Sequence, residues 1–211
     1  MEIRQMIGRM TPLTSRLLLC ASLIIPLASK GETWTIDPNH TAAQFSVKHM
    51  GISTVRGAFT KLKGTVEYDR ANPAKSAIDV TIEASSLDTR VDRRDQDVRG
   101  PHFLDVDKYP TISFKSTRVE ANGPGKLKAF GDLTIHGVTK QVTLDIDGPT
   151  EPIKDQRGNL HMGASATTTI DRTEFGITAM TAMVGTGITI TIDAELTKPS
   201  GNPAPGSSAQ D

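Results

Sequence analysis

The segment Ile78-Asp79-Val80-Thr81-Ile82-Glu83-Ala84 alternates apolar and polar residues with period two. Such alternation is typical of a β-strand in an antiparallel sheet that buries one face and exposes the other. The same pattern recurs along the chain and predicts about eight strands. The apolar positions of the others are Ala43, Phe45, Val47 and His49; Ala58, Leu62, Val66 and Tyr68; Ile112 and Phe114; Leu127, Ala129, Leu133 and Ile135; Val142, Leu144 and Ile146; Leu160, Met162, Ala164, Ala166 and Ile170; and Ile188, Ile190, Ile192 and Ala194.

Short turn signals separate the predicted strands. Residues 69–73, 122–125, 147–149 and 157–159 are rich in Gly, Pro, Asn and Asp, the residue types that favour turns. Strands linked in this way favour up-and-down connections over parallel βαβ units. The sequence therefore predicts an all-β fold with antiparallel strands, either closed as a single eight-stranded barrel or stacked as a sandwich.

The sizes of the inward side chains favour a barrel, and a hollow one. The whole chain has only six Phe, two Tyr and one Trp to fill an interior. Many inward positions are small: Ala58, Ala84, Ala129, Gly131, Ala164 and Ala166. An eight-stranded barrel has room either for its own side chains or for one ligand. The same small residues also fit a filled core in which they pack against larger partners, so both alternatives stay open.

The segment Asp88–Asp107 interrupts the alternation with ten charged side chains. We predict a short helical insert near residues 88–105, capped by Asp88 and placed at the rim of the barrel. In one interpretation this insert is a solvated helix laced with ion pairs. In the other, Arg90, Arg94 or Arg99 points toward the barrel opening and holds a phosphate or another polar headgroup by paired hydrogen bonds.

The two ends of the chain differ in composition from the rest. Residues 1–31 are typical of a signal peptide, with a basic leader, an apolar stretch over 17–27 and small residues as far as Gly31. We therefore expect an exported protein with one domain over residues 32–197. Residues 198–211 are rich in Pro, Gly, Ser and Ala, which predicts a disordered tail.

Composition and residue spacing argue against an enzyme, a cofactor, a metal or a nucleic-acid partner. The chain has 24 basic and 24 acidic side chains, too balanced for general binding to nucleic acid. Its one cysteine, Cys20, falls in the predicted leader, and the sequence has no Gly-x-Ser-x-Gly elbow and no glycine-rich phosphate loop. No spacing places two imidazoles on one metal ion, since the histidines are scattered as His40, His49, His102, His136 and His161.

Several segments, in their order along the chain, resemble one known family. They include Trp34–Thr41 (WTIDPNHT), Phe45–His49 (FSVKH), Gly131–Thr139 (GDLTIHGVT) and Ile170–Ile177 (IDRTEFGI). Over residues 34 to about 196 the chain resembles the YceI-like family of lipid-binding proteins. This resemblance implies a lipocalin-like antiparallel β-barrel, usually periplasmic. It also implies that the barrel holds a polyisoprenoid or a similar long-chain amphiphile, such as a quinone or a prenyl phosphate.

A ligand of this kind suggests which residues contact it. An isoprenoid tail requires a dry channel lined by apolar side chains, with a polar group at one end that sets its direction. The predicted ligand-binding residues are Phe45, Val47, His49, Phe59, Ile82, Arg90, Arg94, Phe103, Phe114, Leu133, Ile135, Ile170, Phe175 and Met183. Met183 is expected to form, with Met180, a pliable lip before the last strand.

The leading hypothesis is a periplasmic carrier or store for isoprenoid lipids. One rival is a protein-interaction module with a filled barrel that docks a partner through the charged insert. Another rival is an enzyme that acts on a lipid, with His49 or His102 and Asp95 as acid and base. A homodimer joined at the barrel mouth also stays open, as does a partner at the membrane that donates lipid or exchanges electrons.

Overall fold

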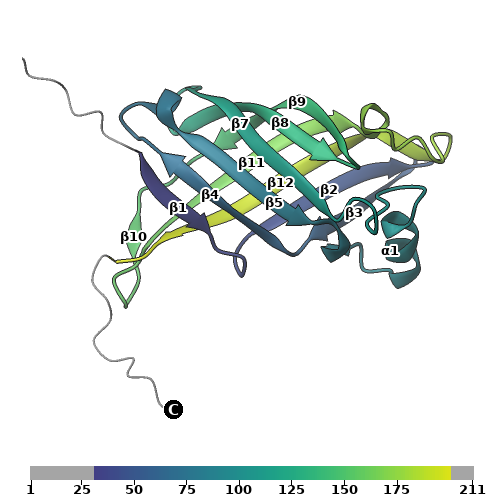
Figure 1. The fold of residues 1–211 in the computed structure, drawn as a ribbon, viewed down its shortest axis with the longest axis horizontal. Helices are drawn as coiled ribbons and strands as arrows, with labels where there is room; N and C mark the ends of the chain where they lie inside the picture. The colour runs from purple at the N-terminus through teal and green to yellow at the C-terminus, as the bar shows by residue number, and fades with distance from the viewer. Residues whose placement is uncertain (1–30, 201–211) are drawn as a thin grey trace, which may run out of the picture.

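The computed structural model of the protein describes residues 31–200, and its strands run obliquely along the longest axis of the molecule (Figure 1). The predicted signal peptide lies outside the described residues except for Gly31, and so does the predicted tail beyond Ser200. Within the described part of the chain, no helix has the length and apolarity needed to cross a membrane.

The described residues form twelve strands, one α-helix and three 3-10 turns. The strands are β1 (Glu32–Ile36), β2 (Ala42–His49), β3 (Ser53–Phe59), β4 (Leu62–Tyr68), β5 (Ala77–Glu83), β6 (Leu87–Asp88), β7 (Thr111–Ala121), β8 (Lys126–Ile135), β9 (Val138–Asp147), β10 (Ile153–Lys154), β11 (Leu160–Asp171) and β12 (Val184–Lys198). The helix is α1 (Asp92–Arg99), and the 3-10 turns are η1 (Pro73–Lys75), η2 (Ala84–Ser86) and η3 (Arg172–Phe175).

Three pairs of consecutive strands each behave as one long, broken strand. β1 and β2 both pair with β12. β4 pairs with β1, and β3 pairs with β2. On their other edges, β4 pairs with β5 and β3 pairs with β6. β5, β7, β8 and β9 follow as neighbours, β9 pairs with β11, and β11 pairs with β12. Eight antiparallel ribbons therefore close into a ring in sequence order, which confirms the predicted eight-stranded barrel.

The breaks within the ribbons have local causes. Pro38 lies between β1 and β2, where a residue without an N–H group cannot donate to a strand ladder. Between β3 and β4, a two-residue link shifts the alternation, so that Phe59 and Leu62 both face the interior. Ala58 was predicted to share that face with Leu62, and this prediction is wrong, because Ala58 is the strand neighbour of inward-facing Phe59.

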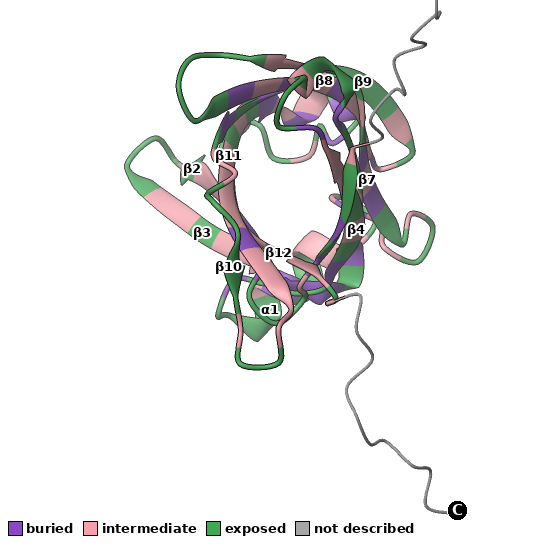
Figure 2. Cartoon of the chain, turned by 90° about the vertical axis from the view of Figure 1, so that its left-hand side faces the viewer, coloured by how far each residue is buried: buried purple, intermediate pink, exposed green. Residues whose placement is uncertain are grey.

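The inward faces of the ribbons carry the buried apolar side chains. Figure 2 views the ring from the end at which β1 begins and β12 ends. At this end Trp34, Ile36, Met162 and Leu196 form a separate buried cluster. The larger cluster extends to the other end of the barrel, where it includes Leu104 from the loop after α1 and Phe175 from η3. Both ends of the barrel are thus reinforced by packed apolar residues.

The charged insert lies at the end opposite the chain termini and contains α1 (Figure 1). Thr89 is buried just before this helix, and its backbone N–H and its hydroxyl both donate to Asp95 Oδ1. Asp88 was predicted to cap the helix, and this prediction is wrong, because its carboxylate accepts from Arg90 N at 2.6 Å and α1 begins later. A bond from inside the helix back to the preceding strand end therefore anchors α1.

We predict that Asp95→Ala lowers the free energy of unfolding by about 1–3 kcal/mol, because two buried donors of Thr89 lose their acceptor. Urea denaturation followed by far-UV circular dichroism measures this change. The control is Asp107→Ala, which removes an exposed carboxylate from the same insert and should change stability by no more than about 0.5 kcal/mol. Equal losses in the two variants would contradict this account of the anchor.

Candidate functional site

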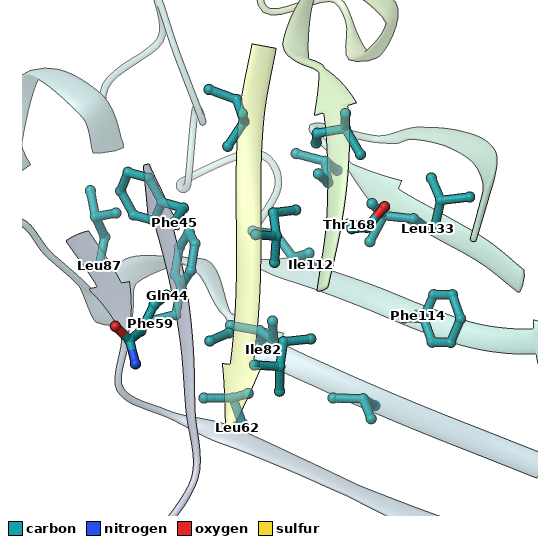
Figure 3. Close-up of a pocket in the computed structure, with 18 of the residues that line it drawn as sticks. Gln44, Phe45, Phe59, Leu62, Ile82, Leu87, Ile112, Phe114, Leu133 and Thr168 are labelled. Carbon is teal, nitrogen blue, oxygen red and sulfur yellow. The ribbon is translucent and has the colours of Figure 1, made fainter. Parts of the chain in front are cut away.

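A cavity of about 1020 Å³ occupies the interior of the barrel. Its wall includes Tyr68 and Leu196 at the end of the barrel where β1 begins, and His49 and Arg172 at the end where α1 lies. The cavity is therefore elongated along the barrel. Nearly all of its wall between these ends is aliphatic or aromatic. Figure 3 shows Phe45, Phe59 and Leu87 on one side of this space and Leu133 and Phe114 on the other. Its shape and lining suit a long, apolar molecule.

Most of the residues predicted from the sequence to bind a ligand do line this cavity. They are Phe45, Val47, His49, Phe59, Ile82, Arg94, Phe103, Phe114, Leu133, Ile135, Ile170 and Phe175. They come from six strands, α1, the loop after it and η3, yet the barrel brings them around one space. Period-two alternation was the signal that found the strand residues, because the inward face of a closed sheet is a single surface.

Two of the predicted residues do not line the cavity. Arg90 is exposed, with a left-handed backbone (φ 67°) that turns the chain away from β6 toward α1. Met183, in the turn before β12, is also exposed and is not part of the cavity wall. Met180, one turn earlier, does line the cavity, and its carbonyl accepts from Met183 N at 2.9 Å.

The sequence left open whether the small inward residues are covered by larger partners in a filled core or border a hollow interior. The structure has both cases. Gly131 is covered by a larger partner, since a Cβ there would come within 2.6 Å of the Phe114 ring. Ala129 is completely buried in the core cluster and does not line the cavity. Ala164 and Ala166 on β11 do line it. The barrel is therefore closely packed at Ala129 and Gly131 on β8 and hollow beside Ala164 and Ala166 on β11. A completely filled barrel, which the interaction-module hypothesis assumed, is not what the structure has.

Charge in the cavity wall is confined to the α1 end. The wall contains two imidazoles, two guanidinium groups and one carboxylate, which belong to His49, His102, Arg94, Arg172 and Asp97. All five lie on the end of β2, on α1 and the loop after it, or on η3. At the opposite end the polar groups of the wall are uncharged and include Thr41 and Ser76. A ligand in this cavity thus meets an apolar tunnel with one charged end.

Arg172 is the most deeply buried of these charged groups, with 5% of its surface exposed. Its guanidinium donates to the carbonyls of Ile177, Val184 and Gly185 at 2.7–3.0 Å. The guanidinium carbon lies 5.9 Å from the centroid of the Phe103 ring. Burial lowers the pKa of this arginine and the neighbouring Asp171 opposes that effect, but an arginine stays protonated at neutral pH. Three of its five N–H groups are used in these bonds.

Arg94 is the second guanidinium in the wall. It donates from Nε to Thr89 Oγ1 and from Nη2 to the Thr89 carbonyl, both at 2.8 Å. These bonds fix the side chain and use two of its five N–H groups. Arg99, which the sequence offered as an alternative, donates to the Leu87 carbonyl and does not line the cavity. Of the three arginines proposed for a headgroup, only Arg94 is in place.

The acid and base proposed for a lipid-modifying enzyme are not assembled. His49 and His102 line the cavity, whereas Asp95 does not and is occupied by both donors of Thr89. The Asp95 carboxylate is thus bonded to Thr89 and not to the imidazole that an acid–base pair would require. The arrangement offers binding groups and an apolar wall.

Arg172 and the β12 side chains Ile188, Ile190 and Ile192 also line the cavity, although the sequence did not mark them as ligand contacts. The β12 residues were recognised as an inward face but were not selected as ligand contacts. Arg172 lies between two predicted lining residues, Ile170 and Phe175, and that position was the available signal. A charged residue directly after a strand is more often solvated, so only the turn η3 reveals that this side chain folds back into the barrel.

Comparison with known proteins agrees with this architecture. Residues 34–196 match the YceI-like domain family. The chain belongs to the YceI-like family. It is 37% identical over 169 residues to a UPF0312 protein of Vibrio cholerae, which covers 78% of this chain and 87% of that relative. It is 35% identical over 162 residues to a UPF0312 protein of a Shewanella species (strain W3-18-1), covering 76% of this chain and 84% of the relative.

Solved YceI-like structures share the fold. A Campylobacter jejuni YceI protein matches with a TM-score of 0.65 and 29% identity, over 72% of this chain and 90% of that one. BcnA of Burkholderia cenocepacia matches with a TM-score of 0.68 and 22% identity, over 76% and 98%. A polyisoprenoid binding domain from Saccharophagus degradans matches with a TM-score of 0.57 and 12% identity, over 79% and 98%. The last two support the fold alone.

The hollow part of this YceI-like barrel gives a prediction about packing. Ala166→Leu should leave the free energy of unfolding unchanged or raise it, because the added methyl groups enter the cavity beside β11. The matched change Ala129→Leu should lower it by about 1–3 kcal/mol, because that position is already closely packed. Urea denaturation of both variants distinguishes the sites, and a similar loss at the two positions would show that the barrel is filled.

Proposed function

We propose that this protein holds a polyisoprenoid, or a similar long-chain amphiphile such as a quinone or a prenyl phosphate, inside its barrel. The apolar tail occupies the tunnel, and the polar head lies at the α1 end near Arg94 and Arg172. The observation that supports this proposal most is the distribution of polarity along the cavity wall, with charged groups at one end only. An amphiphile has the same distribution, whereas a uniformly apolar or a small polar ligand does not.

Burial of the tail supplies the affinity in this proposal. A tail that removes about 400 Å² of apolar surface from water gains about 10 kcal/mol at ~25 cal/mol per Å². Loss of translational and conformational freedom costs about 4 kcal/mol or more, and a net value of about 6 kcal/mol corresponds to binding in the range of tens of micromolar. Because aliphatic walls recognise the width of a chain more than its identity, selectivity between tails should be loose. The charged end then becomes the main source of discrimination between headgroups.

Similar proteins support the ligand class. The Saccharophagus degradans domain of the same fold is described as polyisoprenoid-binding. The proposed role for our chain is likewise binding, for carriage or storage, without catalysis and without a cofactor other than the bound lipid. Asp95, the carboxylate that an acid–base mechanism would require, has its buried partner in Thr89, which favours binding over catalysis.

The α1 end is also the proposed route by which lipid enters. Six large apolar side chains in the described residues are exposed, and five of them lie in the loops and the turn at this end: Met50, Ile52, Val91, Met180 and Met183. Met50 N donates to the Met183 carbonyl, so the β2–β3 turn and the loop before β12 lie against each other. Met180 belongs both to this rim and to the cavity wall, which makes the apolar surface continuous from outside to inside.

The proposed compartment is the periplasm. The basic and apolar pattern of residues 1–31 supports export, and a periplasmic lipid carrier requires a donor and an acceptor at a membrane. A second copy of the chain that covers the apolar rim would be a way to shield the lipid between these encounters. The mass of the N-terminal peptide of protein recovered from cells tests whether the leader is removed.

The headgroup is tested by titrating the protein with a polyprenyl phosphate and with the polyprenol of the same chain length. We expect Arg94→Gln to weaken binding of the phosphate by about tenfold or more and to leave binding of the alcohol nearly unchanged, because a hydrogen bond to a charged group contributes about 1.5–3 kcal/mol. Arg93→Gln is the matched control, since Arg93 is exposed on the same helix outside the cavity wall.

Three results would contradict parts of this function. Failure of the unaltered protein to bind either lipid removes the carrier role itself. Equal loss of both lipids in Arg94→Gln shows that Arg94 only maintains the fold of the insert. An effect of Arg93→Gln as large as that of Arg94→Gln shows that the phosphate binds on the outer surface of α1.

A further inference from the structure

A second cluster of ionisable side chains lies on the outer surface, at the end of the barrel opposite α1. Asp37, His40 and Glu195 each present one potential metal-ligating atom, and these atoms all lie within 4.8 Å of one another. Within the described residues, no other group of three such side chains meets this condition. The cluster joins the turn between β1 and β2 to the outward face of β12, so it has no part in the lipid cavity.

The distances within the cluster are close to those around a tetrahedral metal ion. His40 Nδ1 lies 2.8 Å from Asp37 Oδ2 and 3.9 Å from Glu195 Oε2. A zinc ion with bonds of about 2.0–2.1 Å separates its ligand atoms by about 3.3 Å. The two observed distances bracket that spacing. A small rotation of the exposed His40 side chain would bring Nδ1 closer to this spacing from both carboxylate oxygens.

The backbone holds the three ligands in position. Asp37 N donates to the Glu195 carbonyl at 2.9 Å, and Glu195 N donates to Thr41 Oγ1 at 3.1 Å. The turn is fixed internally as well, because Asn39 N donates to Asp37 Oδ1 at 2.8 Å. The segment 37–41 is thus attached to β12 on both sides of His40, and little conformational entropy remains to be lost when a ligand binds.

A second layer of residues orients Glu195. His161 Nδ1 lies 2.7 Å from Glu195 Oε1, and His161 Nε2 lies 3.3 Å from Asp155 Oδ2. Metal-ligating carboxylates are commonly held by such outer hydrogen bonds. With Oε1 bound to His161, Glu195 directs Oε2 toward His40. An open depression of about 730 Å³, whose wall includes His40, His161, Asp155 and Glu195, gives a solvated ion access to the cluster.

We propose that Asp37, His40 and Glu195 bind a zinc ion, with His161 as a positioning residue for Glu195. Zinc accepts imidazole nitrogens and carboxylate oxygens as ligands, and three protein ligands leave its fourth coordination position open. Magnesium and calcium prefer oxygen ligands alone, so the imidazole favours zinc over those ions. Bound zinc would connect the β1–β2 turn to β12 and so reinforce the barrel where the first ribbon meets the last. The sequence-based expectation of no metal rested on pairs of histidines, and this site uses one histidine.

The test is a zinc titration of the full-length chain without a histidine tag, by isothermal calorimetry in a buffer that does not chelate metals. We expect one zinc per chain and a higher midpoint of thermal unfolding in its presence. His40→Ala and Glu195→Gln should each weaken zinc binding by about tenfold or more, and His161→Ala by about tenfold through loss of the outer hydrogen bond. The side chain of His40 is 64% exposed, so its removal does not threaten folding.

Glu174→Gln is the matched control, because Glu174 is an exposed glutamate on η3 at the other end of the barrel. Its zinc affinity should equal that of the unaltered protein. X-ray absorption at the zinc edge should show one imidazole nitrogen among oxygen ligands. The proposal is overturned if zinc does not saturate at one ion per chain, if the His40 and Glu195 variants bind it as tightly as the control, or if magnesium competes with zinc at equal concentration.

Discussion

The continuous antiparallel ladder between β11 and β12 is the interaction on which the rest of the structure depends. It pairs every residue from Leu160 to Asp171 with a partner on β12 and joins the last two ribbons of the sheet. β12 also pairs on its other edge with β1 and β2, so the sheet has no free edge around the ring. Once the ring is closed, the inward faces of eight ribbons must share one interior, and their side-chain volumes decide whether it is filled.

The volumes leave that interior partly empty and graded in polarity. On β11 the small side chains of Ala164 and Ala166 leave space at the wall, whereas on β8 Gly131 is covered by the Phe114 ring. The connections at the α1 end return Arg94 and Arg172 to the wall, where the guanidiniums are held by a threonine and by backbone carbonyls rather than by carboxylates. Among residues 31–200 neither guanidinium forms a salt bridge, and a lipid with an anionic or strongly polar head would complement these two positive charges at one end of the apolar tunnel.

Local pattern predicted the fold and much of the cavity wall, because alternation and turn residues are local and a closed ring turns one face of every strand inward. It failed where a residue's direction depends on a break or a turn. The link after Phe59 reversed the assignment of Ala58, a left-handed backbone turned Arg90 outward, and η3 turned Arg172 inward. The cluster of Asp37, His40 and Glu195 could not be predicted from local pattern for a different reason. Glu195 lies on the last strand, and only closure of the barrel brings it next to the first turn.

The central claim is that the hollow interior of this YceI-like barrel holds one long-chain lipid. Native mass spectrometry of protein isolated from cells without detergent, followed by organic extraction of whatever is released, is the direct test. The account predicts a mass increase of one lipid per chain and recovery of a prenyl lipid or similar amphiphile. A ligand-free mass that also stays unchanged after incubation with prenyl lipids would contradict it.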